Sequence, residues 1–438
     1  MQSCEAPRTK PGLSNSQRRD WLYALLLSGS LVGFSFVSLV PTMLGIPSRP
    51  TSILFRASML TGSLWIIARW VRGLTRFRGG PIVWVFFSFW GLLLARLVWD
   101  ETFSALPLPL DWTDYWLFGV GVSLVPAVAL LEVPTGATLR LALTLTEVMG
   151  VASVVGLVWL GAAAVRNVGL TGEAGELDRL ATTAVNPAYL GYMAVTVFTV
   201  SSFLIIDAVR TSSASPGLIL LRGAAVLISV GAMVASASKG PIAVAAIISV
   251  VFLFVRGKHA RSTRAALLRL LMLAVVATAG VSAAIVLEES TSLRPVSRFT
   301  EFVNDQSTLE RQQMLEGAFK QFSGSPILGD DIVELSSLTY PHDILLESLM
   351  STGVVGGALL AVLMVYSLRR AWELIGSGDG REWLSLVHIV FWLLAMTAGS
   401  LIFTPHIWAT TSAILAATSR FQQGVESRPP NGQGSTLR

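Results

Sequence analysis

The sequence carries little charge and almost no cysteine. Only 13% of its 438 residues are charged, whereas 53% are hydrophobic, and a soluble domain carries about twice that share of charge. This deficit excludes an ordinary soluble fold and predicts that most of the surface faces lipid or other helices. The single cysteine, Cys4, excludes an intramolecular disulfide and a zinc site built on several thiolates.

Common signatures of nucleotide, hydrolase and metal chemistry are also absent. The chain has no G-x-x-x-x-G-K-[ST], no G-x-S-x-G and no D-x-D, so ATP hydrolysis, serine hydrolysis and metal-dependent use of nucleotide sugars lose their usual motifs. The four histidines form no close ligand cluster. We therefore expect no cofactor and no bound metal. The net charge of +5 reflects membrane topology, and nothing in the sequence supports binding to nucleic acid.

Long apolar runs predict an all-α, polytopic transmembrane bundle. A helix needs about 20 apolar residues to cross a bilayer, and the runs lack the period-two alternation of a β-barrel. We expect about twelve spans, at the following residues: 21–43, 52–70, 81–98, 114–131, 141–165, 188–206, 217–236, 240–255, 265–287, 344–367, 383–403 and 407–419.

Arginine and lysine in the short loops predict the orientation of these spans. They gather before the first span, after the second, after the eighth and after the tenth, and such segments stay on the cytoplasmic side. The protein is then a multi-pass protein of the cytoplasmic (inner) membrane with both termini inside. It divides into a cytoplasmic tail at 1–20, nine spans within 21–287, an extracytoplasmic catalytic loop at 288–343, three spans within 344–421 and a disordered cytoplasmic tail at 422–438.

The large extracytoplasmic loop is predicted to contain an amphipathic helix. Ser307 begins a capping box, and apolar residues follow it at helical spacing until Gly324 ends the pattern. At about 100° per residue, Arg311 shares the apolar stripe with Phe322. Its guanidinium is therefore expected to point toward the protein and not toward water.

Polar residues at the predicted outer face are the main candidates for chemistry. Lys239, in the turn before residues 240–255, either presents its ammonium to an anionic ligand or snorkels at a helix end. Arg298 and Arg311 lie in the loop, where an arginine either is simply solvated or uses its planar fork to bind phosphate oxygens. His342 either accepts a proton near neutral pH or is an interfacial residue without a task.

Four other residues at this face are secondary candidates. Glu347 either orients the histidine ring or hydrogen-bonds a neighbouring helix, and His406 is the reserve base in an external turn. Asn186 either contributes to the site or only ends a loop, and Arg56 near the outer end of the second span could join an anion site.

A set of motifs follows in order between residues 186 and 365: Asn186-Pro187-x-x-x-Gly191, Ser238-Lys239-Gly240, Arg311-x-x-x-Leu315, Phe322-Ser-Gly-Ser-Pro326-Ile-Leu-Gly329, Pro341-His342-Asp343-x-x-Leu346-Glu347 and Gly353-Val-Val-Gly356. In order, spacing and predicted side of the membrane, they resemble the O-antigen ligase and polymerase family. Lys239 stands where that family usually has arginine, and Asp343 where it usually has asparagine.

The resemblance implies a metal-independent membrane glycosyltransferase. Such an enzyme transfers a glycan from an undecaprenyl-diphosphate carrier to a sugar hydroxyl of a glycolipid or glycan acceptor, at the outer face of the cytoplasmic membrane. It implies that His342 is the base and that Arg311, Lys239 and Arg298 stabilise the leaving diphosphate. We expect an O-antigen ligase. The alternatives are a repeat-unit polymerase and, from another class, a lipid-linked sugar transporter or flippase, which would be expected to show internal repeats.

Overall fold

The computed structural model describes residues 14–73, 80–104, 108–171, 187–211, 215–257, 306–375 and 380–426, with a few single residues between 278 and 289. Over these ranges the regular structure is helical, with an isolated β-bridge between Glu334 and Thr339 and no strand, which confirms the all-α class. The helices are α1 (Asn15–Ser28), α2 (Phe34–Leu44), α3 (Ser48–Val71), α4 (Ile82–Phe103), α5 (Gly121–Ala129), α6 (Gly136–Thr171), α7 (Pro187–Thr211), α8 (Pro216–Ala235), α9 (Lys239–Gly257), α12 (Gln306–Gly324), α13 (Ile344–Ile375), α14 (Glu382–Ala398) and α15 (Pro405–Glu426), with π-helical turns η1 (Gly29–Gly33) and η2 (Asp114–Val120).

Seven helical segments in the described part of the chain are long and apolar enough to cross a bilayer. Each coincides with a predicted span, and three shorter apolar helices, Asp114–Ala129, Lys239–Phe252 and Glu382–Ala398, coincide with three more. The predicted span at 265–287 lies almost wholly outside the described residues. The structure therefore supports a multi-pass membrane protein, whereas the count of twelve spans stays a prediction.

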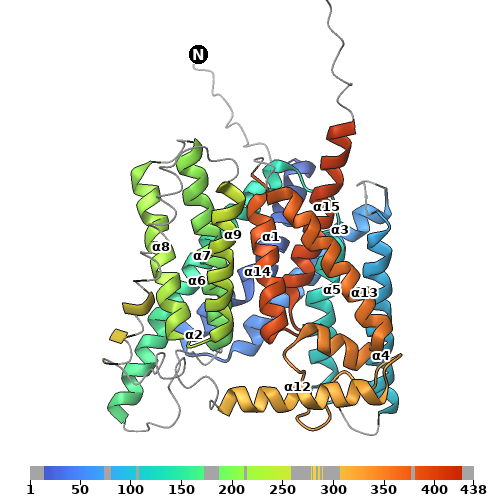
Figure 1. The fold of residues 1–438 in the computed structure, drawn as a ribbon. Coiled ribbons are helices and arrows are strands. Elements are labelled where there is room, and N and C mark those ends of the chain that lie inside the picture. Colours follow the sequence, from blue (N-terminus) through green and yellow to red (C-terminus); the bar gives the residue numbers. More distant parts are fainter. Residues whose placement is uncertain are drawn as a thin grey trace, which may run out of the picture.

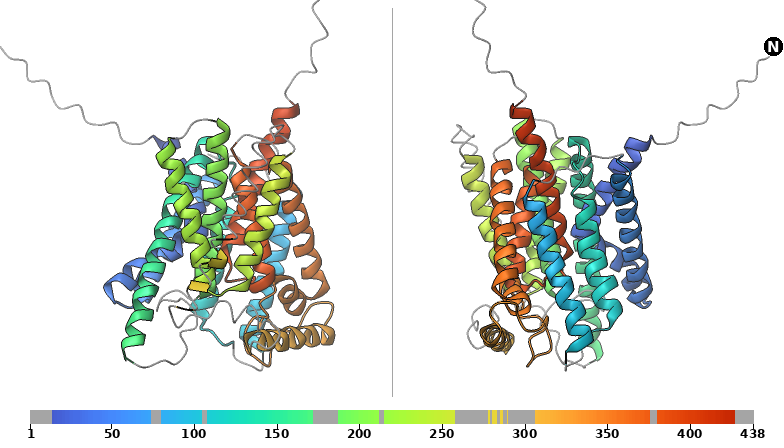
Figure 2. Two further views of the ribbon diagram at one scale, coloured as in Figure 1. Left: turned by 60° about the vertical axis from the view of Figure 1, so that its left-hand side comes forward. Right: turned by 90° about the vertical axis from the view of Figure 1, so that its right-hand side faces the viewer.

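Helix α12 differs from the others in its direction. The long helices run side by side, and α12 lies across one end of the bundle, opposite the end at which α1 begins and α15 finishes (Figures 1 and 2). It ends at Gly324, as the sequence predicts, but it already includes Gln306 and Ser307, so Ser307 is not the N-cap that the capping box predicts. Its apolar stripe packs inward at Ala318, which is fully buried. We refer to this end of the molecule as the α12 end.

The segment between α12 and α13 docks into a break in α13. At Gly353 the backbone leaves the helical region, with φ 65° and ψ −165°, and freed backbone groups near a membrane must find partners. The Val354 amide donates to the Pro326 carbonyl at 2.8 Å, and the Asp330 amide donates to the Met350 carbonyl at 2.9 Å. A Cβ at position 353 would lie 2.2 Å from the Ile327 carbonyl oxygen, so only glycine fits. The close approach of the segment explains why the motif has a glycine at position 353.

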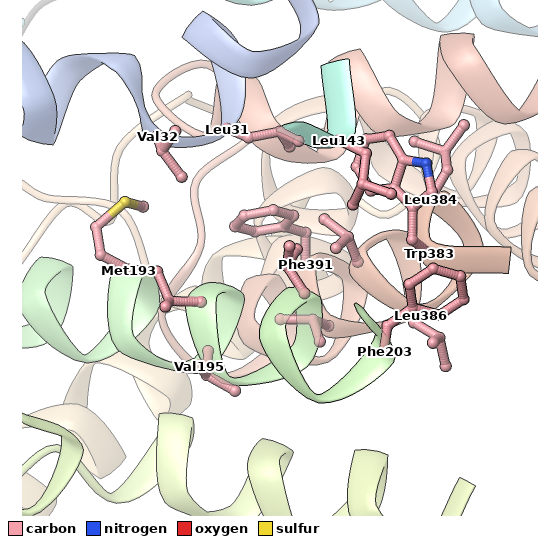
Figure 3. Packing of buried hydrophobic residues seen from close by; sticks show 14 of the residues in the cluster. Leu31, Val32, Leu143, Met193, Val195, Phe203, Trp383, Leu384, Leu386 and Phe391 are labelled. Atoms are coloured by element: carbon pink, nitrogen blue, oxygen red, sulfur yellow. The ribbon is translucent and has the colours of Figure 1, made fainter. Parts of the chain in front are cut away.

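Two hydrophobic clusters hold the bundle together, and α14 belongs to both. The first joins residues of η1, α6, α7 and α14, including Leu31, Phe203 and Phe391 (Figure 3). The second surrounds Trp408 of α15, whose ring lies 5.0 Å from that of Trp90 in α4. Phe391 packs into the first cluster and Trp392 into the second. Helix α14 is therefore held from two sides.

Candidate functional site

The last residues of α14 are the point at which several predicted site residues meet. Arg311 donates from Nη1 to the Thr397 carbonyl at 3.0 Å. One nitrogen of the guanidinium therefore contacts the protein, as the helical stripe predicts, whereas the residue as a whole is exposed to solvent. The carbonyl at the end of a helix lacks an intrahelical partner, so the arginine satisfies it and ties α12 to α14.

Lys239, at the start of α9, approaches the same place from another direction. Its Nζ lies 3.3 Å from the Thr308 hydroxyl, and Thr308 is on the face of α12 that carries Arg311 because the two are three residues apart. Gly240 packs against α14, where a Cβ would lie 3.0 Å from the Thr397 hydroxyl. The structure thus brings together the predicted cations Lys239 and Arg311, which are 72 positions apart in the numbering.

The turn that carries Lys239 is held by the first turn of α7. Gly191 lies so close to this turn that a Cβ would be 2.7 Å from Pro241 and 3.2 Å from the Ser236 hydroxyl. Ala237 adopts a left-handed φ of 46°, which is uncommon for a residue other than glycine. The close approach explains the glycine of the Asn186-Pro187-x-x-x-Gly191 motif, although Asn186 itself lies outside the described residues.

His342 completes this group from the segment before α13. Its backbone also has a left-handed φ, 59°, and its ring packs edge-on against Tyr340 with centroids 4.5 Å apart. The ring interacts with the Ala398 carbonyl and with the charge of Arg311. Its Nδ1 is buried and has no hydrogen-bond partner among the described residues.

The surroundings of His342 keep its imidazole neutral. Burial lowers its pKa below the ordinary value of 6.5, and the positive charge of Arg311 lowers it further, while the Ala398 carbonyl acts in the opposite direction. A neutral imidazole at neutral pH can accept a proton. We name the group of Lys239, Arg311 and His342 at the end of α14 the cationic site.

The two carboxylates beside His342 have structural partners. Asp343 accepts hydrogen bonds from the Leu345 and Leu346 amides at 3.0 and 2.9 Å, as an N-cap of α13 does. Glu347 is buried and accepts from the Ser400 hydroxyl at 3.0 Å and from the Leu401 amide at 2.9 Å. Of the two roles considered for Glu347, these bonds support contact with a neighbouring element, because both oxygens hold the turn between α14 and α15.

His406 and Arg56 form a separate group deeper in the bundle. His406 is only 2% exposed, so it is a buried residue in the first turn of α15 and not part of an open external turn. Its Nε2 lies 3.2 Å from the Tyr189 hydroxyl, and its ring stacks on Phe391. The Arg56 guanidinium lies 3.9 Å from the centroid of the Phe118 ring and interacts electrostatically with Tyr189.

Two tyrosines near the cationic site were not singled out from the sequence. Tyr192, in the second turn of α7, and Tyr340, beside His342, both interact electrostatically with Arg311. The signal for Tyr192 was its position next to Gly191 in a predicted span entry. Arg298, which is predicted together with Lys239, Arg311 and His342, lies outside the described residues.

No group of three or more histidine, cysteine, aspartate and glutamate side chains that could hold a metal ion occurs in the described ranges. Compared with known proteins, the sequence matches no family model and no curated protein. The resemblance to the O-antigen ligase and polymerase family therefore rests on the motifs, and the function is argued from the residues of the site.

Proposed function

We propose that the protein transfers a glycan from an undecaprenyl-diphosphate carrier to a sugar hydroxyl at the extracytoplasmic face of the cytoplasmic membrane. The proposal rests on one observation: Lys239, Arg311 and His342 come from three distant segments and meet at the end of α14. Two cations beside a neutral imidazole suit a reaction in which a diphosphate leaves and a hydroxyl attacks.

Each residue has a chemical task in this reaction. As the bond between the anomeric carbon and the diphosphate oxygen breaks, negative charge grows on the diphosphate, and the guanidinium of Arg311 and the ammonium of Lys239 stabilise it. His342 accepts the proton of the attacking hydroxyl. A direct displacement of this kind inverts the anomeric centre. The lipid diphosphate is itself the activated leaving group, so the reaction needs no nucleotide.

The proposal requires the α12 end to face the outside of the cell. A cysteine at exposed Gln313 of α12 and another at exposed Arg72, after α3, provide a matched pair in a Cys4→Ser background. We expect an impermeant maleimide to label Gln313→Cys in intact cells or, where an outer membrane exists, in spheroplasts, and Arg72→Cys only after lysis. The reverse pattern would reject the orientation and the proposed function with it.

Purified protein tests the reaction directly. In detergent, with an undecaprenyl-diphosphate-linked oligosaccharide and a glycolipid acceptor, the wild type should form a glycosylated acceptor and His342→Ala should not. A lipid-linked sugar transporter would instead move a labelled donor across proteoliposomes without forming product. That result would replace the proposed function.

A deletion strain separates the ligase from the polymerase by gel electrophoresis. The absence of a ligase leaves full-length polymer on the lipid carrier, whereas the absence of a polymerase leaves single repeats on the final acceptor. We favour the ligase because the part of the loop that the structure describes contains one helix, α12, and no further folded unit that could hold a growing chain. Single-repeat product would assign the same site to a polymerase.

A further inference from the structure

We infer that Tyr192 is a further binding residue of the cationic site, and that its hydroxyl donates a hydrogen bond to the anionic group bound by Arg311. The inference deepens the proposed function and rests on it, because it assumes that the site binds a phosphate or diphosphate. It adds α7 to the elements that contact this ligand.

The hydroxyl of Tyr192 is buried without a partner. The residue is 7% exposed, and its hydroxyl has no hydrogen bond within the described part of the chain. Two other tyrosines of the bundle behave differently: Tyr23 donates to the Leu130 carbonyl at 3.1 Å, and Tyr189 pairs with His406. Buried polar groups are nearly always bonded, and an unpartnered one calls for an explanation.

The position of this hydroxyl supplies the explanation. Gly191, its neighbour in sequence, packs on the turn that carries Lys239, and Tyr192 interacts electrostatically with both Arg311 and Tyr340. His342, whose ring contacts Tyr340, has a second buried and unpartnered atom, Nδ1. Two unsatisfied groups in one site indicate that a polar ligand completes their hydrogen bonds.

An anion is the ligand that suits these groups best. A guanidinium has five N–H donors, and the one hydrogen bond of Arg311 to a described residue is that from Nη1 to Thr397. Its remaining donors, the ammonium of Lys239 and the phenol of Tyr192 can all donate to the same oxygens. Hydrogen bonds to charged groups are the strong ones, so each phosphate oxygen bound here would be held by several donors.

Three variants of the full-length protein in detergent test the inference, with inorganic pyrophosphate as the probe. Tyr192→Phe removes only the hydroxyl, and Arg311→Ala removes the cation. Tyr366→Phe is the matched control, because Tyr366 also contacts an arginine, accepting from Arg370 at 3.0 Å, but lies in the second half of α13, away from the site. Binding is measured by titration calorimetry, and unfolding temperature is measured without the probe.

We expect Tyr192→Phe to weaken pyrophosphate binding about tenfold or more, Arg311→Ala to weaken it at least as much, and Tyr366→Phe to leave it unchanged. Without the probe, Tyr192→Phe should unfold at the same temperature as the wild type or higher, because the lost hydroxyl has no described partner. A lower unfolding temperature would show a structural bond and overturn the inference.

The outcomes separate this inference from the proposed function. If Tyr192→Phe binds pyrophosphate like the wild type while Arg311→Ala does not, the role of Tyr192 is rejected and the cationic site stands. If the wild type does not bind pyrophosphate, the role of Tyr192 is also rejected, because the site then binds no such anion. If binding follows the expectation but purified protein transfers no glycan, the anion site stands and the proposed function fails.

Discussion

The α12 end has an acidic side and a cationic side, and the two differ in whether their buried polar groups have partners. On the acidic side, each of the carboxylates of Asp100, Asp331, Glu334 and Glu347 has a partner, although Oδ1 of Asp100 is held only by an ion pair. Asp100 forms an ion pair with Arg96 and accepts from the Ile332 amide at 2.9 Å. On the cationic side, the Tyr192 hydroxyl and the His342 Nδ1 are buried without partners in the described ranges.

The acidic side builds the segment between α12 and α13. Asp331 accepts from the Ser104 hydroxyl at 3.1 Å, and Glu334 accepts from the Ser337 amide at 2.8 Å. Glu334 also packs on α12, where a Cβ at Gly317 would lie 2.3 Å from its Oε1. These bonds attach the segment to α4 and α12.

The comparison separates structural polar groups from groups that await a ligand. A carboxylate whose oxygens both accept hydrogen bonds has little capacity left for chemistry, whereas a buried donor without a partner is costly unless a ligand satisfies it. The two sides differ in the sign of their charge, which the sequence shows, and in their hydrogen bonding, which only the structure shows. Substitutions on the cationic side should therefore change transfer, and those on the acidic side should change stability.

The largest effect is expected from His342→Ala. Loss of a positioned base lowers a rate by about 10²–10⁴-fold. The protein should still fold, because the variant loses only the ring contacts with the Ala398 carbonyl and Tyr340. Glycan transfer by purified protein and the unfolding temperature measure the two effects. His406→Ala is the comparison: it opens a space beside Phe391 and should reduce stability more than transfer. If His406→Ala were stable but inactive and His342→Ala were active, His406 and not His342 would be the base.

A smaller effect is expected from Lys239. The alanine variant removes a cation next to Thr308 and should lower kcat/KM by about 10–100-fold, the value of a hydrogen bond to a charged group. Lys239→Arg keeps the charge and should retain most of the activity. Transfer assays of both variants decide between a ligand-binding lysine and a snorkelling one. Full activity of the alanine variant would show that Lys239 only snorkels at the helix end.

On the acidic side, Glu334→Ala should lower the free energy of unfolding by about 1–3 kcal/mol, because it removes a buried carboxylate that accepts hydrogen bonds from Ser336 and Ser337. Burial alone would raise the pKa of Glu334, but the donors of Ser337 and Ser336 outweigh it and lower the pKa below 4.5. Its stabilisation is therefore present above this value and lost as the pH falls through the lowered pKa. Denaturation of wild type and variant should differ at pH 7 and converge in acid, with transfer per folded molecule unchanged.

The smallest effect concerns pH. Because burial and Arg311 lower the pKa of His342 below 6.5, the acid limb of kcat/KM should fall below pH 6.5 and the enzyme should stay active in mild acid. Removing the nearby charge raises that pKa, so the residual activity of Arg311→Gln should have its acid limb at higher pH. Glu334→Gln should not move it. An acid limb above pH 6.5 in the wild type would argue against His342 as the base.

Much of the fold follows from local patterns. The apolar runs predict helices that the structure contains. Gly324 predicts the end of α12, and the helical stripe predicts the contact of Arg311 with the protein. These features depend on residues within a few turns of one another. The roles of Glu347 and His406 were less accessible, because their partners, Leu401 and Tyr189, are contributed by other segments of the chain.

The sequence by itself determined that this chain is helical, apolar enough for a membrane, and equipped with a basic amphipathic segment, because periodicity and composition act locally. The tertiary structure decided which polar groups are satisfied. It interrupts α13 at Gly353, where the segment from Pro326 docks, and it brings Tyr192 into electrostatic interaction with Arg311. Whether a buried group has a partner depends on packing between elements far apart in the chain, so no local pattern shows which side contains the groups without partners.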